Sequence, residues 1–147
     1  MTTRQFTILH VEDDPNDVLL VQRAFKKSHS TAVVQSVADG DQALAYLAGT
    51  GPFTDRDQHP APALVLLDLK MPRKTGLEVL AWIRQQPHLK RLIVVIFTSS
   101  THDHDIKLAY ERGANSYLMK PVGFEALQET IKQIDHYWGQ LNLAPCS

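Results

Sequence analysis

Acidic, hydroxyl and amino side chains follow apolar runs at four places in this sequence. They are Glu12-Asp13-Asp14 after residues 6–11, Asp68 after residues 63–67, Thr98-Ser99-Ser100 after residues 92–97, and Lys120 after residues 115–119. Carboxylates bind Mg²⁺, and a hydroxyl and a lysine bind the oxygens of a phosphoryl group. If the four groups met, the crowded carboxylates would need a cation to neutralise them. These residue types therefore indicate metal-dependent phosphoryl chemistry.

The elements that would position these groups are short strands alternating with helices. Each apolar run is typical of a strand buried on both faces of a sheet. Strands are expected at residues 6–11, 32–37, 63–67, 92–97 and 115–119, and helices are expected to begin near residues 15, 40, 75, 102 and 124. Residues 49–62 contain three prolines and two glycines and predict a surface loop. This repeated βα pattern predicts a parallel α/β sheet with helices on both faces, which places all four polar groups at one edge.

Length, charge and cysteine content restrict the class of protein. A chain of 147 residues predicts one domain, and its net charge of −1 gives no electrostatic reason to expect nucleic acid or an anionic membrane as a partner. No apolar run approaches the length of a transmembrane helix, and residues 1–5 lack the apolar region of a signal peptide. Cys146 is the only cysteine, which excludes a disulfide framework and predicts a reducing, cytoplasmic location.

The full set of motifs, from about residue 6 to residue 138, resembles the receiver domain of two-component response regulators. This resemblance implies the flavodoxin-like (βα)5 fold, a five-stranded parallel sheet of order 2-1-3-4-5. It also implies a receiver domain over residues 1–138, followed by a short tail at residues 139–147 with no output domain. Such a protein is a phosphoacceptor in signalling rather than an enzyme acting on a separate substrate.

The resemblance gives four residues a role in phosphoryl transfer and metal binding. Asp68 would be the phosphoacceptor, which receives its phosphoryl group from a sensor histidine kinase. Asp13 would bind Mg²⁺, or Mn²⁺ in its place, with Glu12 contributing directly or through water. The backbone carbonyl of Lys70 would be a further metal ligand.

Other residues would act once the phosphoryl group has been transferred. Thr98 would be the switch hydroxyl, Lys120 would pair with the phosphoryl group, and Tyr117 would be the switch aromatic. Ser100, and the Lys70 side chain, depart from the commoner residues of the family beside the phosphoryl group. We therefore expect these two side chains to tune the lifetime of the phosphorylated state.

Softer features are similar to the single-domain regulators that serve bacterial, mostly cyanobacterial, phytochrome kinases. They are the loop at residues 49–62, the run at residues 97–100 and the ending at residues 137–145. This likeness implies a phytochrome as the kinase. Tyr137 and Trp138, near the aliphatic Leu141 and Leu143, also predict a homodimer that uses the face between the fourth and fifth helices. A role for Trp138 in closing the core is an equal alternative.

Three other functions compete with that of an active receiver. A phosphatase with an aspartyl nucleophile needs a second acid two residues after Asp68, where this chain has Lys70. A flavodoxin needs a loop rich in glycine and hydroxyl groups after its first strand, where Glu12-Asp13-Asp14 would repel a flavin phosphate. A degenerate receiver that acts only as a scaffold remains the alternative, and a phosphorylation assay separates it from an active one.

Overall fold

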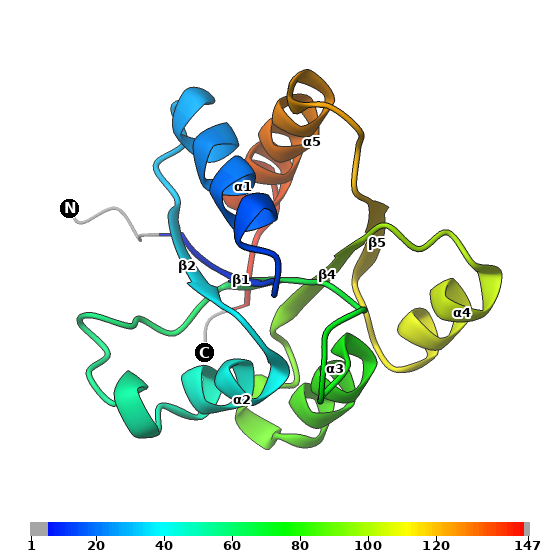
Figure 1. Ribbon diagram of the computed structural model, residues 1–147. Coiled ribbons are helices and arrows are strands. Elements are labelled where there is room, and N and C mark those ends of the chain that lie inside the picture. Colours follow the sequence, from blue (N-terminus) through cyan, green and yellow to red (C-terminus); the bar gives the residue numbers. More distant parts are fainter. Residues whose placement is uncertain (1–5, 146–147) are drawn as a thin grey trace.

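The computed structural model describes residues 6–145, so Cys146 and the first five residues lie outside the described part. Five parallel strands form one sheet in the order β2-β1-β3-β4-β5, as the resemblance predicts (Figure 1). The strands are β1 (Thr7–Val11), β2 (Val33–Val37), β3 (Leu64–Leu67), β4 (Ile93–Thr98) and β5 (Ser116–Met119). The helices are α1 (Pro15–Lys27), α2 (Gly40–Ala48), α3 (Gly76–Gln85), α4 (Asp103–Glu111) and α5 (Phe124–His136).

Helices cover both faces of the sheet and divide the core in two. Helices α1 and α5 pack on one face, while α2, α3 and α4 cover the other (Figure 1). Every residue of the inner strands β1, β3 and β4 is buried, which explains their nearly continuous apolar runs. The edge strands β2 and β5 are mostly part-exposed and carry more polar residues.

Local signals in the sequence explain where the helices begin and end. Asp14, Asp39 and Thr75 cap the N-termini of α1, α2 and α3, each accepting a hydrogen bond from a backbone N–H of the first turn. Gly49 ends α2 and Gly113 follows α4, both with positive φ angles that suit a glycine. The side-chain caps thus fix the loops that lead from β1, β2 and β3 into α1, α2 and α3.

Two expected elements differ from those observed. The apolar pattern of the last helix continues to Trp138 in the sequence, but the helix ends at His136, and a π-helical turn, Tyr137–Leu141, follows it. Trp138 is half-buried against the α1–α5 core, whereas Tyr137 is exposed, so only one of the two aromatic rings is a free surface feature. The loop at residues 49–62 contains a 3₁₀ turn, Gly51–Phe53, and is tied down by a 2.8 Å hydrogen bond from the Tyr46 hydroxyl to the Pro60 carbonyl.

Within residues 6–145, every helix is too short or too polar to cross a lipid bilayer.

Candidate functional site

The four predicted groups converge at the carboxyl edge of the sheet. Glu12, Asp68 and Lys120 each follow the last residue of a strand and continue its hydrogen bonding to a neighbouring strand, and Thr98 is the last residue of β4. The Asp68 N–H donates to the Val11 carbonyl at 3.1 Å, and the Lys120 N–H donates to the Thr98 carbonyl at 2.8 Å. The Glu12 N–H likewise donates to the carbonyl at the end of β2, at 3.1 Å. Backbone hydrogen bonds therefore hold these residues as firmly as the strands that precede them.

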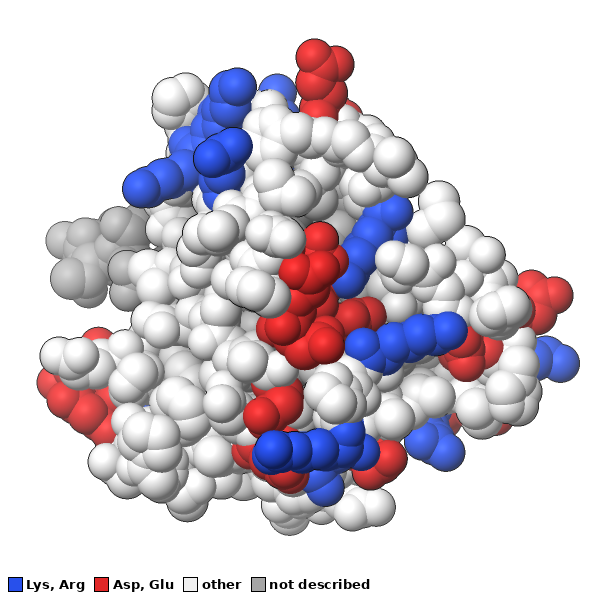
Figure 2. Space-filling model, in the orientation of Figure 1, with Lys and Arg blue, Asp and Glu red and all other residues white. Residues whose placement is uncertain are grey.

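Three carboxylates form an acidic cluster at this edge. Oxygen atoms of Glu12, Asp13 and Asp68 all lie within 4.8 Å of one another, with Glu12 and Asp68 buried and Asp13 exposed. Acidic side chains gather in the middle of this face, over the start of α1, with basic side chains beside them (Figure 2). A hard divalent cation prefers such oxygen ligands, so the donor set fits Mg²⁺ or Mn²⁺.

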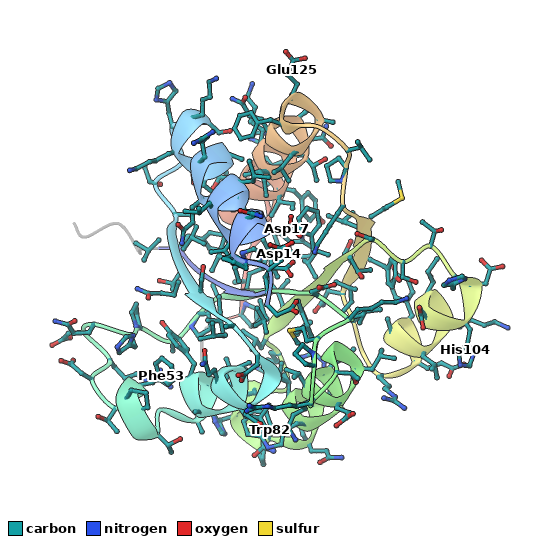
Figure 3. All side chains as sticks on the ribbon, viewed as in Figure 1. Asp14, Asp17, Phe53, Trp82, His104 and Glu125 are labelled. Carbon is teal, nitrogen blue, oxygen red and sulfur yellow. The ribbon has the colours of Figure 1, made fainter. Side chains whose placement is uncertain are left out.

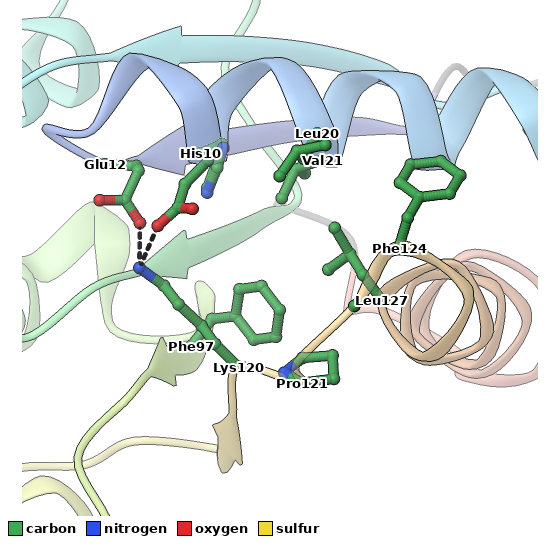
Figure 4. A pocket seen from close by; sticks show the side chains of 11 residues that line it. His10, Glu12, Leu20, Val21, Phe97, Lys120, Pro121, Phe124 and Leu127 are labelled. Carbon is green, nitrogen blue, oxygen red and sulfur yellow. Dashed lines mark hydrogen bonds and ion pairs between the residues drawn. The ribbon is translucent and has the colours of Figure 1, made fainter.

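The Lys120 ammonium lies among the carboxylates and contacts three of them. It donates hydrogen bonds to Glu12 and, at 3.0 Å, to Asp17 Oδ2 (dashed lines in Figure 4), and its Nζ is 3.5 Å from Asp68 Oδ2. Burial acts to lower the pKa of Lys120, but its bonds to Glu12 and Asp17 and the charge of Asp68 outweigh burial and raise that pKa. Lys120 is therefore a fixed positive charge at the site.

The pKa values of two buried side chains, His10 in β1 and Glu12 just after it, are shifted by this environment. Burial, with a smaller effect from the charge of Asp68, raises the pKa of Glu12 even though Lys120 acts in the opposite direction. Burial, and then the charge of Lys120, lower the pKa of His10 to about 4, so His10 is neutral near neutral pH. His10 also lines a cavity of about 140 Å³ between α1 and α5, together with Phe97 and Lys120 (Figure 4).

The hydroxyl groups of the site lie at and after the end of β4. Thr98 is 1% exposed, and its Oγ1 accepts a 3.5 Å hydrogen bond from the Ser100 N–H. Ser100 donates its own hydroxyl to Asp105 at 2.6 Å, while the half-buried Tyr117 donates its hydroxyl to the Ser100 carbonyl at 2.9 Å. Thr98 and Tyr117 are thus joined through the backbone of Ser100.

The loop after Asp68 is fixed by a close approach to the start of α3. A side chain on Gly76 would lie 2.2 Å from the Asp68 carbonyl oxygen, which is far too near, and the Gly76 N–H donates to the Leu69 carbonyl at 3.0 Å. Only glycine fits at this position. Lys70 lies in this loop with an exposed side chain, and its N–H is 3.5 Å from Asp68 Oδ1.

Sequence reasoning missed three residues of this environment, namely His10, Asp17 and Asp105. Asp17 sits in the first turn of α1, close to Asp14 and over the sheet edge (Figure 3), where an acid is commonly explained by the helix dipole. Alternation along β1 places His10 on the same face of the sheet as Ile8, beneath α1 and α5, which was a usable signal. No sequence signal pairs Asp105 with Ser100.

Comparison with known proteins settles the family. The model of the response regulator receiver domain matches residues 8–132. The chain belongs to the response regulator receiver family. It is therefore a receiver-domain signalling protein, and its acidic cluster fits the acidic pocket at which receiver domains bind a divalent metal.

Two relatives show which proteins of the family the receiver is similar to in sequence. The receiver is 39% identical over 140 residues to the probable methanogenesis regulatory protein FilR2 of Methanothrix harundinacea, covering 95% of this chain and 88% of FilR2. It is also 39% identical over 131 residues to the response regulator Rcp1 of Synechocystis, covering 89% of this chain and 87% of Rcp1.

Solved structures agree with these sequence matches. The phosphorylated cyanobacterial phytochrome response regulator RcpA superimposes with a TM-score of 0.89 at 35% identity, covering 97% of this chain and all (100%) of RcpA. The Mn²⁺-bound form of Rcp1 superimposes with a TM-score of 0.85 at 37% identity, covering 96% and 99% of the two chains. The receiver is thus related to phytochrome response regulators.

Proposed function

We propose that this receiver accepts a phosphoryl group from a sensor histidine kinase on Asp68. The observation that carries the proposal is the environment of that carboxylate. Asp68 is 6% exposed, lies within 4.8 Å of two other carboxylates and has the Lys120 ammonium 3.5 Å away. A carboxylate that only capped a helix would have no need of this arrangement.

Transfer consists of one displacement at phosphorus. An Asp68 oxygen attacks the phosphorus of a phosphohistidine, the P–N bond breaks, and the histidine nitrogen keeps the electron pair. Glu12, Asp13, Asp68 and the Lys70 carbonyl would hold Mg²⁺, or Mn²⁺ in its place, and a bound cation supplies charge neutralisation for the phosphoryl oxygens. Lys120 keeps its proton and offers a second positive charge to the same oxygens.

Phosphorylation is then read out at the surface. A phosphoryl group on Asp68 would draw in the Thr98 hydroxyl as a hydrogen-bond donor. Thr98 is joined to Tyr117 through Ser100, so its movement would reach α4 and β5. The new charge thereby changes the face formed by α4, β5 and α5.

The direct test is a phosphotransfer assay with purified histidine kinases and radiolabelled ATP. The wild type should become labelled and Asp68→Asn should not, while Asp55→Asn, an exposed acid of the loop at residues 49–62, should label normally. Equal labelling of Asp68→Asn would refute the assignment. A wild type that no kinase or acetyl phosphate labels would favour the scaffold alternative.

We propose that the kinase is a phytochrome and that the transfer takes place in the cytoplasm. The support is the likeness to RcpA and Rcp1. FilR2 is equally identical in sequence, so the kinase panel should include kinases unrelated to phytochromes. A phytochrome should transfer fastest, at a rate that changes between red and far-red illumination. Light-independent transfer at the rate of the other kinases would contradict this partner.

We further propose a homodimer through the α4–β5–α5 face, with no nucleic acid or membrane partner. Tyr110 of α4, Met119 of β5 and Val122 just after β5 are 50%, 56% and 97% exposed, so this face offers large apolar side chains. Light scattering at tens of micromolar, roughly where weak dimers form, tests the proposal. A strictly monomeric mass with and without phosphorylation would contradict it.

A further inference from the structure

A third carboxylate, Asp17, shares the Lys120 ammonium with Glu12 and Asp68. Asp17 Oδ2 lies 3.0 Å from Lys120 Nζ, whereas the nearest Asp68 oxygen lies 3.5 Å from it. Asp17 is also the outermost partner, since its side chain is 37% exposed while those of Glu12 and Asp68 are 2% and 8% exposed. Glu12, at the end of β1, and Asp17, on α1, are therefore both nearer to the ammonium than Asp68 is.

Asp17 is free for this contact because the start of α1 is capped by other groups. The Asp14 carboxylate accepts the Asn16 N–H at 2.9 Å, and Glu12 Oε2 accepts the Asp14 N–H at 3.2 Å. An acid at the third helical position often bonds back to the N-cap N–H, but Glu12 already occupies that donor. The Asp17 side chain instead lines the cavity between α1 and α5 beside Lys120.

The charges make Asp17 a competitor of the phosphoacceptor. One ammonium serves three anions, and a phosphoryl group adds further negative charge at Asp68. Lys120 must then give its strongest bond to the phosphoryl oxygens and relinquish at least part of its contact with α1. We propose that Asp17 is a positioning residue that competes with Asp68 for the Lys120 ammonium and so weakens binding of a phosphoryl group, an inference that rests on the proposed function of Asp68.

The test measures binding of beryllofluoride, which imitates a phosphoryl group on a carboxylate, by calorimetry in the presence of Mg²⁺. Asp17→Asn should bind it about fivefold more tightly than the wild type, a value between those of exposed and buried charged hydrogen bonds. Asp17→Glu keeps a carboxylate at this position and should bind beryllofluoride with nearly wild-type affinity. Asp14→Asn removes a charge from the same helix start, keeps an N-cap side chain and should change affinity little.

A second readout monitors the ammonium itself in the metal-free protein. Hydrogen exchange of the Lys120 NH₃⁺ group, measured by NMR on ¹⁵N-lysine protein, should be faster in Asp17→Asn and unchanged in Asp14→Asn. Unchanged exchange in Asp17→Asn would overturn the proposal, and so would unchanged or weaker beryllofluoride binding, or an equal gain in Asp14→Asn. If the wild type bound no beryllofluoride, the phosphoacceptor function would fail, and the exchange measurement would still decide whether Asp17 holds Lys120.

Discussion

Ser100 donates its hydroxyl hydrogen to the Asp105 carboxylate across 2.6 Å, which fastens the segment after β4 to the first turn of α4. The family resemblance placed the Ser100 side chain beside the phosphoryl group, where we expected it to tune the lifetime of the phosphorylated state. In this structure its hydrogen is committed to Asp105, and Ser100 itself is 6% exposed. Donating a hydrogen bond to a hydrolytic water would therefore require this bond to open.

Breaking the bond should loosen α4. Asp105→Ala should lower the free energy of unfolding by about 1–2 kcal/mol, because it leaves a buried hydroxyl without its charged partner. Urea denaturation measures the change, and hydrogen exchange should be faster in the first turns of α4. The control is Asp103→Ala, which removes an exposed acid from the same turn. Equal losses in the two variants would mean that only the helix dipole matters.

Asp13 should be required for metal binding. Asp13→Ala should weaken Mg²⁺ binding by about tenfold or more, because it removes a charged oxygen ligand from the acidic cluster. Isothermal calorimetry gives the affinity directly. Asp14→Asn, which removes the neighbouring charge outside the cluster, should retain most of the affinity. Undiminished binding by Asp13→Ala would rule out the ligand role.

Thr98 should connect phosphorylation to the surface. Thr98→Ala should accept phosphoryl from a kinase at close to the normal rate, yet lose the phosphorylation-dependent change in hydrogen exchange over α4, β5 and α5. Thr98→Ser keeps the hydroxyl and should keep most of the response. If Thr98→Ala responded fully, the path through Ser100 to Tyr117 would not be the switch.

Lys70 should prolong the phosphorylated state. Its exposed side chain follows Asp68 by two residues and can reach over a phosphoryl group, where its charge would stabilise the dianion and hinder water. Lys70→Ala should shorten the half-life of phospho-Asp68 about two- to fivefold, as expected of an exposed charge contact. Loss of radiolabel without any phosphatase measures it, with Lys74→Ala as the control from the same loop. A half-life as long as that of the wild type would show that Lys70 points into solvent.

His10 should make stability depend on pH. Its pKa is about 4 in the folded protein and about 6.5 in the unfolded chain, so the unfolded chain binds more protons between these values. The contribution is fully present above pH 6.5 and is lost as the pH falls toward 4, amounting to about 3 kcal/mol. His10→Leu should flatten this part of the stability curve measured by urea denaturation in metal-free buffer. The control is His136→Gln, at an exposed position, which should leave the pH dependence of the free energy of unfolding unchanged. If His10→Leu kept the pH dependence of the wild type, His10 would not be its source.

The sequence was sufficient to predict those site residues that stand at the end of a strand. Asp68 and Lys120 follow apolar runs directly, so the end of each run located them to within a residue. The family resemblance supplied the strand order that the alternating pattern left open. Together these two kinds of information place the acids, the hydroxyl and the ammonium at one edge of the sheet.

The contacts that could not be predicted from the sequence join side chains of different helices and strands. Asp17 meets Lys120 across 103 residues of chain, and the contact depends on how α1 is rotated over the sheet and how high its first turn sits. Periodicity fixes neither quantity. The π-helical turn after α5 could not be predicted either. Trp138 continues the apolar pattern of α5, although the backbone hydrogen bonding is already π-helical at this residue.

Lys120 and Glu12 are bonded although 108 residues separate them, and β5 pairs with no strand other than β4 within the described residues. During synthesis, a ribosome makes the acidic residues early and the lysine that balances them late. A nascent or truncated chain that ends before β5 would carry its carboxylates without their ammonium. The full set of opposite charges at this edge of the sheet is therefore assembled only when the final strand has docked on β4.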